Sequence, residues 1–369
     1  MVKYLKELIL TAAVVCTALL MPVTAQAATT WSVMPAQDFQ GVSLNAVSCS
    51  STSFCLAFGI NGPQPLVFEW NGTTWSATDV PDGATAINSV SCVSATYCIA
   101  VGYSFFNGTQ TAAWLWNGSR WSELAAFNPA TKWNYLKAVK CLSTTDCEAV
   151  GLAGTHEGFD HHPLAEVWNG TTWTGQTIQG TVSGELDAVA CTAAASCEAV
   201  GTRPAASGKT AGIALRWKGT AWVSQKLPAL AGGSRLSGVS CYLAGCTAVG
   251  STPTPGGGQS TLAEAWNGSR WALQSPAGSG NVKGAIYTIW SAVHCQSATN
   301  CTVAGTWFPA AGGGNLTLAE TWNGSAWIKN NTPTPDPSGG GFEAMSCTGG
   351  GRVCTAVGNA GGTGLAERN

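Results

Sequence analysis

Short runs of alternating apolar and polar residues recur along the chain, separated by glycine, asparagine and serine. One run covers residues 46–49, and after a tight loop a second covers residues 55–59. A third run, such as 262–266, ends in tryptophan, and a fourth begins at another tryptophan five residues later. Because side chains alternate along a β-strand, each such unit predicts four antiparallel strands.

The third and fourth runs of a unit are joined by a hairpin with the pattern WNGxxW. It occurs at residues 70–75, 116–121, 168–173, 217–222 (with Lys in place of Asn), 266–271 and 322–327. The Asn-Gly step supplies the positive φ angles that a tight hairpin requires. A two-residue or a four-residue turn places both tryptophans on one face of the sheet. We therefore interpret the tryptophan pair as a packing element first.

The cysteines repeat with the same period. Apart from Cys16, the 15 cysteines form seven close pairs: Cys49 with Cys55, Cys92 with Cys98, Cys141 with Cys147, Cys191 with Cys197, Cys241 with Cys246, Cys295 with Cys301, and Cys347 with Cys354. Successive pairs begin 43 to 54 residues apart, a period typical of a propeller or a solenoid. Each pair spans one predicted hairpin, which suits a disulfide, whereas seven zinc sites would need more than the four histidines present.

The chain ends complete the repeat. Seven cysteine pairs but six WNGxxW hairpins leave one unit unfinished. The C-terminal residues 364–369 match the start of LAEAWN, and residues 29–32 match the TTWS of residues 73–76. We predict an all-β, seven-bladed β-propeller with four antiparallel strands per blade, closed by an N-terminal strand that joins the C-terminal blade. Closure leaves only short, protected sheet edges.

The N-terminal segment and the charge indicate where the protein works. Residues 1–27 carry two lysines, an apolar run and Ala25-Gln26-Ala27, which predicts a secretory signal peptide before a single propeller domain at residues 28–369. No later run is long enough to span a membrane. With a net charge of −2 and no run of like charge, nucleic-acid binding is not expected. We expect a secreted, extracellular monomer.

The long, variable connections should all lie at one end of the ring, and they are rich in aromatic residues. Exposed rings on a neutral surface suit stacking against the C–H faces of sugars. Alternatively, the rings plug the channel or pack under their own loops. The candidate ligand-binding aromatics are Phe106, Trp133, Tyr135, Tyr287, Trp290, Trp307 and Phe308.

Two sets of polar residues stand out. Residues 155–162 hold three of the four histidines, and His156, Asp160 and His161 are candidates for ligand contact; together with Glu157 such residues could bind a divalent metal or perform acid–base work. Their spacing matches no metalloenzyme motif, so no metal or cofactor is predicted. Glutamates also recur two residues before the first hairpin tryptophan, or at the matching position of the C-terminal copy: Glu166, Glu264, Glu320 and Glu367. We expect each of them to be a structural partner at the blade interface.

The repeat SC-x5-C-xAVG…LAExWNGxxW resembles that of secreted actinobacterial-type propeller-repeat proteins across nearly the whole chain. Its Trp-bearing blades are also similar in style to tectonin-like propeller lectins, which implies glycan sites between blades. The G-x-T-W of residues 72–75 resembles half of the Asp-box of sialidase-type propellers, but the Asp is missing. No arginine cluster of that family is found, so sialidase activity is not implied.

Three functions remain open. The favoured one is a non-catalytic binding protein, lectin-like, for an extracellular glycan or polysaccharide. The first alternative is a secreted polysaccharide lyase or glycoside hydrolase with one site at the mouth of the ring. The second is an extracellular scaffold for protein–protein interaction.

Overall fold

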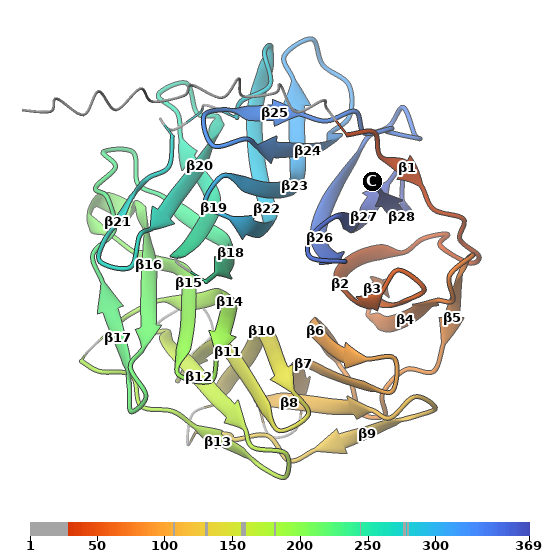
Figure 1. The fold of residues 1–369 in the computed structure, drawn as a ribbon, viewed down its shortest axis with the longest axis vertical. Helices are drawn as coiled ribbons and strands as arrows, with labels where there is room; N and C mark the ends of the chain where they lie inside the picture. Colours follow the sequence, from red (N-terminus) through yellow and green to blue (C-terminus); the bar gives the residue numbers. More distant parts are fainter. Residues whose placement is uncertain are drawn as a thin grey trace, which may run out of the picture.

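Seven four-stranded antiparallel sheets surround a central channel as the blades of a propeller (Figure 1). The computed structural model describes residues 29–105, 108–129, 132–155, 160–180, 182–243, 245–275, 278 and 280–369. The predicted signal segment, Phe106 and His156 lie outside the described residues. Within the described residues, the prediction of an all-β, seven-bladed propeller is confirmed.

From the channel outward, blade 1 contains β2 (Ser43–Ser51), β3 (Phe54–Asn61), β4 (Gln64–Trp70) and β5 (Trp75–Thr78). Blade 2 contains β6 (Ala86–Ser94), β7 (Tyr97–Phe105), β8 (Thr109–Trp116) and β9 (Trp121–Leu124). Blade 3 contains β10 (Trp133–Ser143), β11 (Asp146–Gly154), β12 (His162–Trp168) and β13 (Trp173–Gly175). Blade 4 contains β14 (Glu185–Ala193), β15 (Ser196–Pro204), the short 3-10 helix η1 (Ala206–Gly208), β16 (Thr210–Trp217) and β17 (Trp222–Gln225).

Blade 5 contains β18 (Arg235–Tyr242), β19 (Gly245–Pro253), β20 (Gln259–Trp266) and β21 (Trp271–Leu273). Blade 6 contains β22 (Ala285–Ser297), β23 (Asn300–Pro309), β24 (Leu316–Trp322) and β25 (Trp327–Lys329). Blade 7 contains β26 (Gly340–Thr348), β27 (Val353–Ala360), β28 (Thr363–Arg368) and, as its outer strand, β1 (Ser32–Val33). A single parallel bridge between Trp133 and Thr109 also links blades 2 and 3.

The ring closes through the N-terminal segment, as predicted. β1 pairs antiparallel with β28, and neighbouring bridges join Thr30 to Asn331 of the blade 6–7 connection and Ala36 to Trp75 of blade 1. The C-terminal strand adds a second tie, because Arg368 donates from Nη1 to the Thr52 carbonyl oxygen of blade 1 over 2.7 Å. The chain ends therefore hold blades 6, 7 and 1 together.

Each WNGxxW hairpin is a four-residue turn. In blade 1, Trp70 and Trp75 are directly paired, and their ring centroids lie 5.8 Å apart. The Asn71 side-chain oxygen accepts the backbone N–H groups of Thr73 at 2.9 Å and Thr74 at 3.0 Å, while Gly72 takes a φ of 97°. The N-G-T/S triplets are thereby explained by turn chemistry.

The tryptophan hairpin and the disulfide form one structural unit. Cys55 lies opposite Trp70 in the sheet, and the Trp70 indole N–H donates to the Thr52 carbonyl oxygen inside the disulfide-closed loop at 3.0 Å. Trp116, Trp168 and Trp322 make the corresponding bond in their own blades. This contact explains why the cysteine and tryptophan motifs recur together.

The seven disulfides predicted from the cysteine spacing are all present, one in each blade. They join Cys49 to Cys55, Cys92 to Cys98, Cys141 to Cys147, Cys191 to Cys197, Cys241 to Cys246, Cys295 to Cys301, and Cys347 to Cys354. Each connects directly opposed residues of the two inner strands, with Cα atoms 3.9 to 4.1 Å apart. Each closes a small loop and contributes about 2 kcal/mol in the loop-entropy estimate. Seven disulfides indicate that the chain folds in an oxidising compartment.

The core lies between the blades. Seven clusters of buried apolar side chains are found among the described residues, and each combines residues of two neighbouring blades. At four of the seven seams, the serine before the first cysteine of one blade accepts the N–H of the first cysteine of the next blade, as between Ser48 and Cys92 at 2.9 Å. The Ser-Cys pairs of the repeat are thus interface elements.

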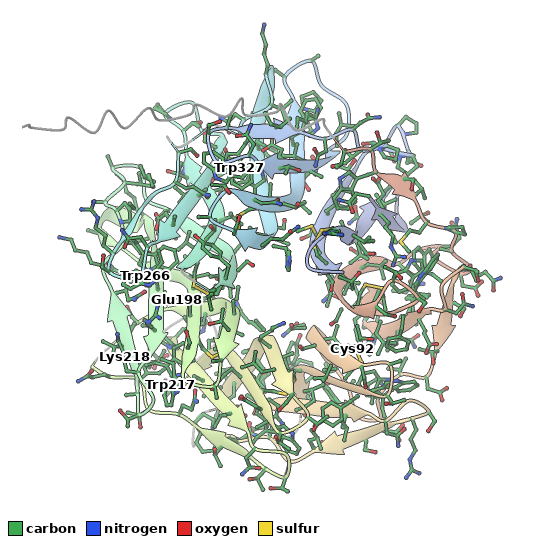
Figure 2. The ribbon with its side chains drawn as sticks, in the orientation of Figure 1. Cys92, Glu198, Trp217, Lys218, Trp266 and Trp327 are labelled. Atoms are coloured by element: carbon green, nitrogen blue, oxygen red, sulfur yellow. A yellow bond between two sulfur atoms is a disulfide. The ribbon has the colours of Figure 1, made fainter. Side chains whose placement is uncertain are left out.

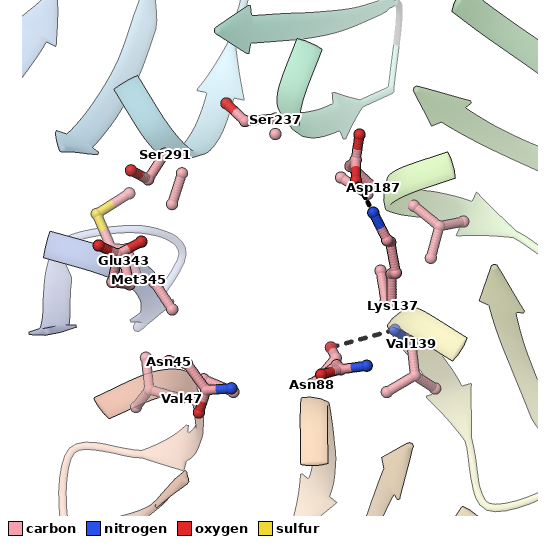
Figure 3. A pocket seen from close by; sticks show the side chains of 18 of the residues that line it. Asn45, Val47, Asn88, Lys137, Val139, Asp187, Ser237, Ser291, Glu343 and Met345 are labelled. Carbon is pink, nitrogen blue, oxygen red and sulfur yellow. Dashed lines mark hydrogen bonds and ion pairs between the residues drawn. The ribbon is translucent and has the colours of Figure 1, made fainter. Parts of the chain in front are cut away.

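Every innermost strand carries a β-bulge at the same position. The extra residue is left out of the ladder and lines the channel (Figure 3): Asn45, Asn88, Lys137, Asp187, Ser237, Ser291 and Glu343. The glycine of the AVG motif lies opposite the residue before the bulge. A Cβ at Gly151 would overlap the Tyr135 carbonyl oxygen, so only glycine fits there.

Candidate functional site

The two ends of the propeller differ in construction. Because consecutive strands are antiparallel, the disulfide loops and WNGxxW turns lie together at one end, which we call the turn end. The remaining connections lie at the other, which we call the loop end. The predicted ligand-site residues that the structure describes belong to the loop end, apart from the buried Trp290.

The aromatics of blade 6 lie in strands and not in loops, contrary to the prediction. Tyr287 belongs to β22, and Trp307 and Phe308 belong to β23. These two strands are 13 and 10 residues long because the hairpin continues beyond the core, with Tyr287 paired to Phe308. Trp133 and Tyr135 are likewise part of β10.

The prediction that Trp290 contacts a ligand is wrong. Its side chain is fully buried, and its ring centroid lies 4.5 Å from that of Trp327. Its indole N–H donates to Glu320 Oε2 at 3.1 Å. Trp307 is partly exposed, but the Lys329 ammonium lies 4.5 Å from its ring centroid and occupies one ring face. Trp290 therefore packs in the interface between blades 5 and 6, and one face of Trp307 is covered by a residue of its own blade.

Tyr287 and Phe308 form the edge of a groove between blades 6 and 7. Their rings are stacked, with centroids 5.5 Å apart and planes at 11°. The Tyr287 hydroxyl donates to Asn315 Oδ1 at 2.7 Å. The groove has a volume of about 370 Å³ and we call it the amide groove; it is lined by Phe308, Gly314, Asn315, Ser338, Gly339, Gly340, Asn359, Gly361 and Gly362.

The hydrogen-bonding groups of the amide groove are partly engaged. Asn315 uses its side-chain oxygen for Tyr287, which orients its amide N–H groups to donate elsewhere. Asn359 donates from Nδ2 to Ser43 Oγ at 3.2 Å, which leaves its side-chain oxygen to accept. Five glycines line the groove, and of these Gly361 and Gly362 are exposed. The groove thus combines an aromatic edge with a fixed donor and a fixed acceptor.

A second aromatic cluster lies where blades 2 and 3 meet. Tyr103 contacts Phe105 and Tyr135, with ring centroids 5.6 and 4.8 Å apart. Burial, together with the charge of Tyr135, raises the pKa of Tyr103 above its ordinary value. Phe105 is 66% exposed. The sequence prediction did not single out Tyr103, although its spacing from Phe105 places both on one face of β7.

Charged residues gather at the channel wall of blades 3 and 4. Lys137 Nζ lies 2.8 Å from Asp187 Oδ1 (Figure 3) and also 2.8 Å from Glu185 Oε2. Burial opposes the charge of Lys137, but the two carboxylates outweigh it and hold the lysine pKa above its ordinary value. Burial in the wall raises the pKa of Asp187, which Lys137 offsets only in part. Lys137 neutralises a carboxylate pair that sequence spacing did not reveal.

A larger pocket adjoins this triad. It has a volume of about 550 Å³ and includes Asp160 and His161, as well as Glu185 from the triad. The structure therefore brings two predicted site residues together with arginines and a lysine: Arg203, Lys209 and Arg235. We call this the cationic pocket. Asp160 accepts the Thr155 hydroxyl, and in the part of the chain described, no cluster suited to a metal ion is found.

Six glutamates are buried between or within blades, and burial raises the pKa of each to about 8: Glu148, Glu166, Glu198, Glu264, Glu320 and Glu367. Glu166 accepts the Phe127 N–H from the preceding blade connection at 3.1 Å. Glu198 of blade 4 and Trp266 of blade 5 lie near one another (Figure 2). Glu198 accepts from Arg216, whose guanidinium lies over the Trp266 ring. Of the four recurring glutamates, Glu166 and Glu320 have hydrogen-bond partners. Both carboxylate oxygens of Glu264 and of Glu367 lack one among the described residues.

The comparisons with known proteins agree with the architecture. No protein-family model matches the chain, and no curated protein matches its sequence. Among solved structures, the chain is similar to "YCF48 bound to D1 peptide" with a TM-score of 0.56 over 93% of this chain and 99% of that one. The two are 14% identical, so the likeness shows the seven-bladed propeller fold alone. No helix within the described ranges is long and apolar enough to cross a membrane.

Proposed function

We propose that this protein is a secreted, non-catalytic binding protein that recognises glycans through the loop end of its propeller. The observation that carries the proposal is the amide groove, where the stacked Tyr287–Phe308 pair borders amide and backbone groups. Its seven disulfides support export to an oxidising environment. Of the aromatic residues predicted from the sequence, Tyr287 and Phe308 are the two that border this groove.

The chemistry of the groove suits a sugar ring. The C–H face of a sugar packs on an aromatic ring, while its hydroxyls need donors and acceptors in fixed directions. Asn315 supplies a donor and Asn359 an acceptor, and both are held by hydrogen bonds to Tyr287 and Ser43. A ligand in such a site replaces water at groups that are already held in place, so no further side chains have to be ordered on binding. This favours weak but specific binding.

The test is a glycan and polysaccharide array with the exported protein, with the same mixtures assayed for reducing ends and unsaturated products. We expect binding without product, and loss of at least about tenfold in affinity for Phe308→Ala, since the ring supplies the stacking surface. Tyr287→Phe keeps the ring but frees Asn315, so a smaller loss is expected. Phe105→Ala removes an exposed ring from blade 2 and serves as the matched control. Product formation would replace the proposal with the lyase or hydrolase alternative.

A second candidate is peptide binding. The structurally similar Ycf48 was solved bound to a D1 peptide, so a propeller of this shape can present a peptide site. This version of the scaffold alternative predicts capture of peptides that soluble sugars do not displace. An array without glycan signal, together with such capture, would favour it over glycan binding.

A further inference from the structure

The cationic pocket is built from two blades and the connections around them. Arg203 lies at the end of β15, Lys209 follows η1, and Arg235 begins β18. Asp160 and Glu185 line the same pocket, together with Ser183 and the histidine at position 161. Residues distant in sequence thus place three cations around one cavity of about 550 Å³.

The pocket carries more positive charge than its own acidic residues neutralise. Glu185 is bound to Lys137 from outside the pocket, and Asp160 accepts from Thr155. Lys209 donates to the Ala231 carbonyl oxygen at 2.7 Å and keeps further N–H groups. Among the described residues, the guanidinium groups of Arg203 and Arg235 form no ion pair or hydrogen bond. Both arginines are exposed and line the cavity, although the charge of Arg235 also acts on Asp187 of the channel wall.

We propose that the cationic pocket is a second glycan site, separate from the amide groove, and that it binds the carboxylate of a uronic acid residue. The inference rests on the proposed glycan-binding function and names its ligand class. The planar donor fork of arginine matches a carboxylate in a bidentate arrangement. A monoanion fits better than a phosphate dianion, because Asp160 and Glu185 in the same wall would repel the second charge.

The acids of the pocket also favour a sugar over a peptide terminus. Asp160 and Glu185 already accept from Thr155 and Lys137, but a carboxylate can accept more than one hydrogen bond. They can therefore also accept from the hydroxyl groups that surround the carboxyl group of a uronic acid. The hydroxyl groups of Ser183 and Thr210 line the same cavity and add further partners. A pocket with arginines for the carboxylate and acceptors for hydroxyls matches both parts of a uronate ring.

The experiment measures binding of trigalacturonate and of its carboxyl-reduced, neutral counterpart by calorimetry with the full exported protein. We expect at least about tenfold tighter binding of the acidic form, because charge-assisted hydrogen bonds are stronger than neutral ones. Arg203→Ala and Arg235→Ala should each remove most of this preference, and added salt should weaken it. Arg270→Ala deletes an exposed arginine at the turn end and should leave it unchanged.

The outcomes separate this inference from the proposed function. Equal binding of both trisaccharides would overturn the inference and leave glycan binding standing, whereas an empty glycan array would overturn the proposed function itself. Competition by peptides with a free C-terminal carboxylate, but not by their amides, would reassign the pocket to peptides. Thermal unfolding of each arginine variant checks its fold, which is expected to be intact because both side chains are exposed.

Discussion

The turn end and the loop end of the propeller are formed by the same strands, but they follow different rules. At the turn end, blade after blade repeats the disulfide loop and the tryptophan hairpin, and the indole N–H joins the two. At the loop end, blade 6 presents stacked rings and blades 3 to 5 present charges. The features that repeat in blade after blade serve packing, whereas the connections that differ between blades are where a single ligand site can arise.

The largest effect that would test this contrast is the loss of a turn-end tryptophan. Trp222 is fully buried and donates to Oε1 of Gln176, in the connection between blades 3 and 4, at 2.5 Å. Trp222→Ala should lower the free energy of unfolding by about 3–5 kcal/mol, as for other buried aromatics. Denaturant unfolding measures this, with Phe308→Ala as the loop-end control, where we expect about 1 kcal/mol or less because its ring is partly exposed. Equal costs at both ends would contradict the contrast.

The fold followed from the sequence because its signals are local and repeated. The spacing between Cys49 and Cys55 defines one hairpin, and the Asn-Gly step at residues 71–72 defines the next turn. The match between residues 29–32 and 73–76 predicted the closing strand. Each of these patterns depends on neighbours within a few residues, which is the range over which turn chemistry acts.

The site did not follow in the same way, because its contacts cross blades. Lys137 meets Asp187 fifty residues further on, at equivalent bulges of neighbouring strands, and nothing near either residue indicates its partner. The burial of Trp290 was missed for a related reason. It precedes the bulge of β22 and turns into the blade interface, whereas composition alone suggested a surface loop.

A second prediction concerns the buried glutamates, which belong to the interior of the propeller and to neither of its ends. Neither carboxylate oxygen of Glu264 has a partner in the described structure, and burial raises its pKa from 4.5 to about 8. The folded state therefore holds its proton more tightly than the unfolded chain. The stability this contributes is full below pH 4.5 and is lost as pH rises through about 8.

Glu264→Gln removes this titration. Between pH 5 and 8, the free energy of unfolding of the unaltered protein should fall by about 1 kcal/mol per pH unit more than that of the variant. Urea unfolding across the pH range measures the difference. Glu123→Gln changes an exposed acid and should follow the unaltered protein. Parallel curves for all three proteins would show that Glu264 does not couple folding to pH.

The smallest effect should come from the triad at the channel wall, where the loop end meets the interior. Lys137→Met leaves Glu185 and Asp187 side by side without their cation. Their partial exposure to water limits the cost to about 1 kcal/mol at neutral pH. Because burial raises the pKa of Asp187, the cost should shrink as the pH falls and this acid takes up a proton. Lys137→Arg keeps the charge and should restore most of the stability. If Lys137→Met instead removed acidic-glycan binding while stability stayed unchanged, the triad would be part of the ligand site. The cationic pocket would then extend to the channel wall.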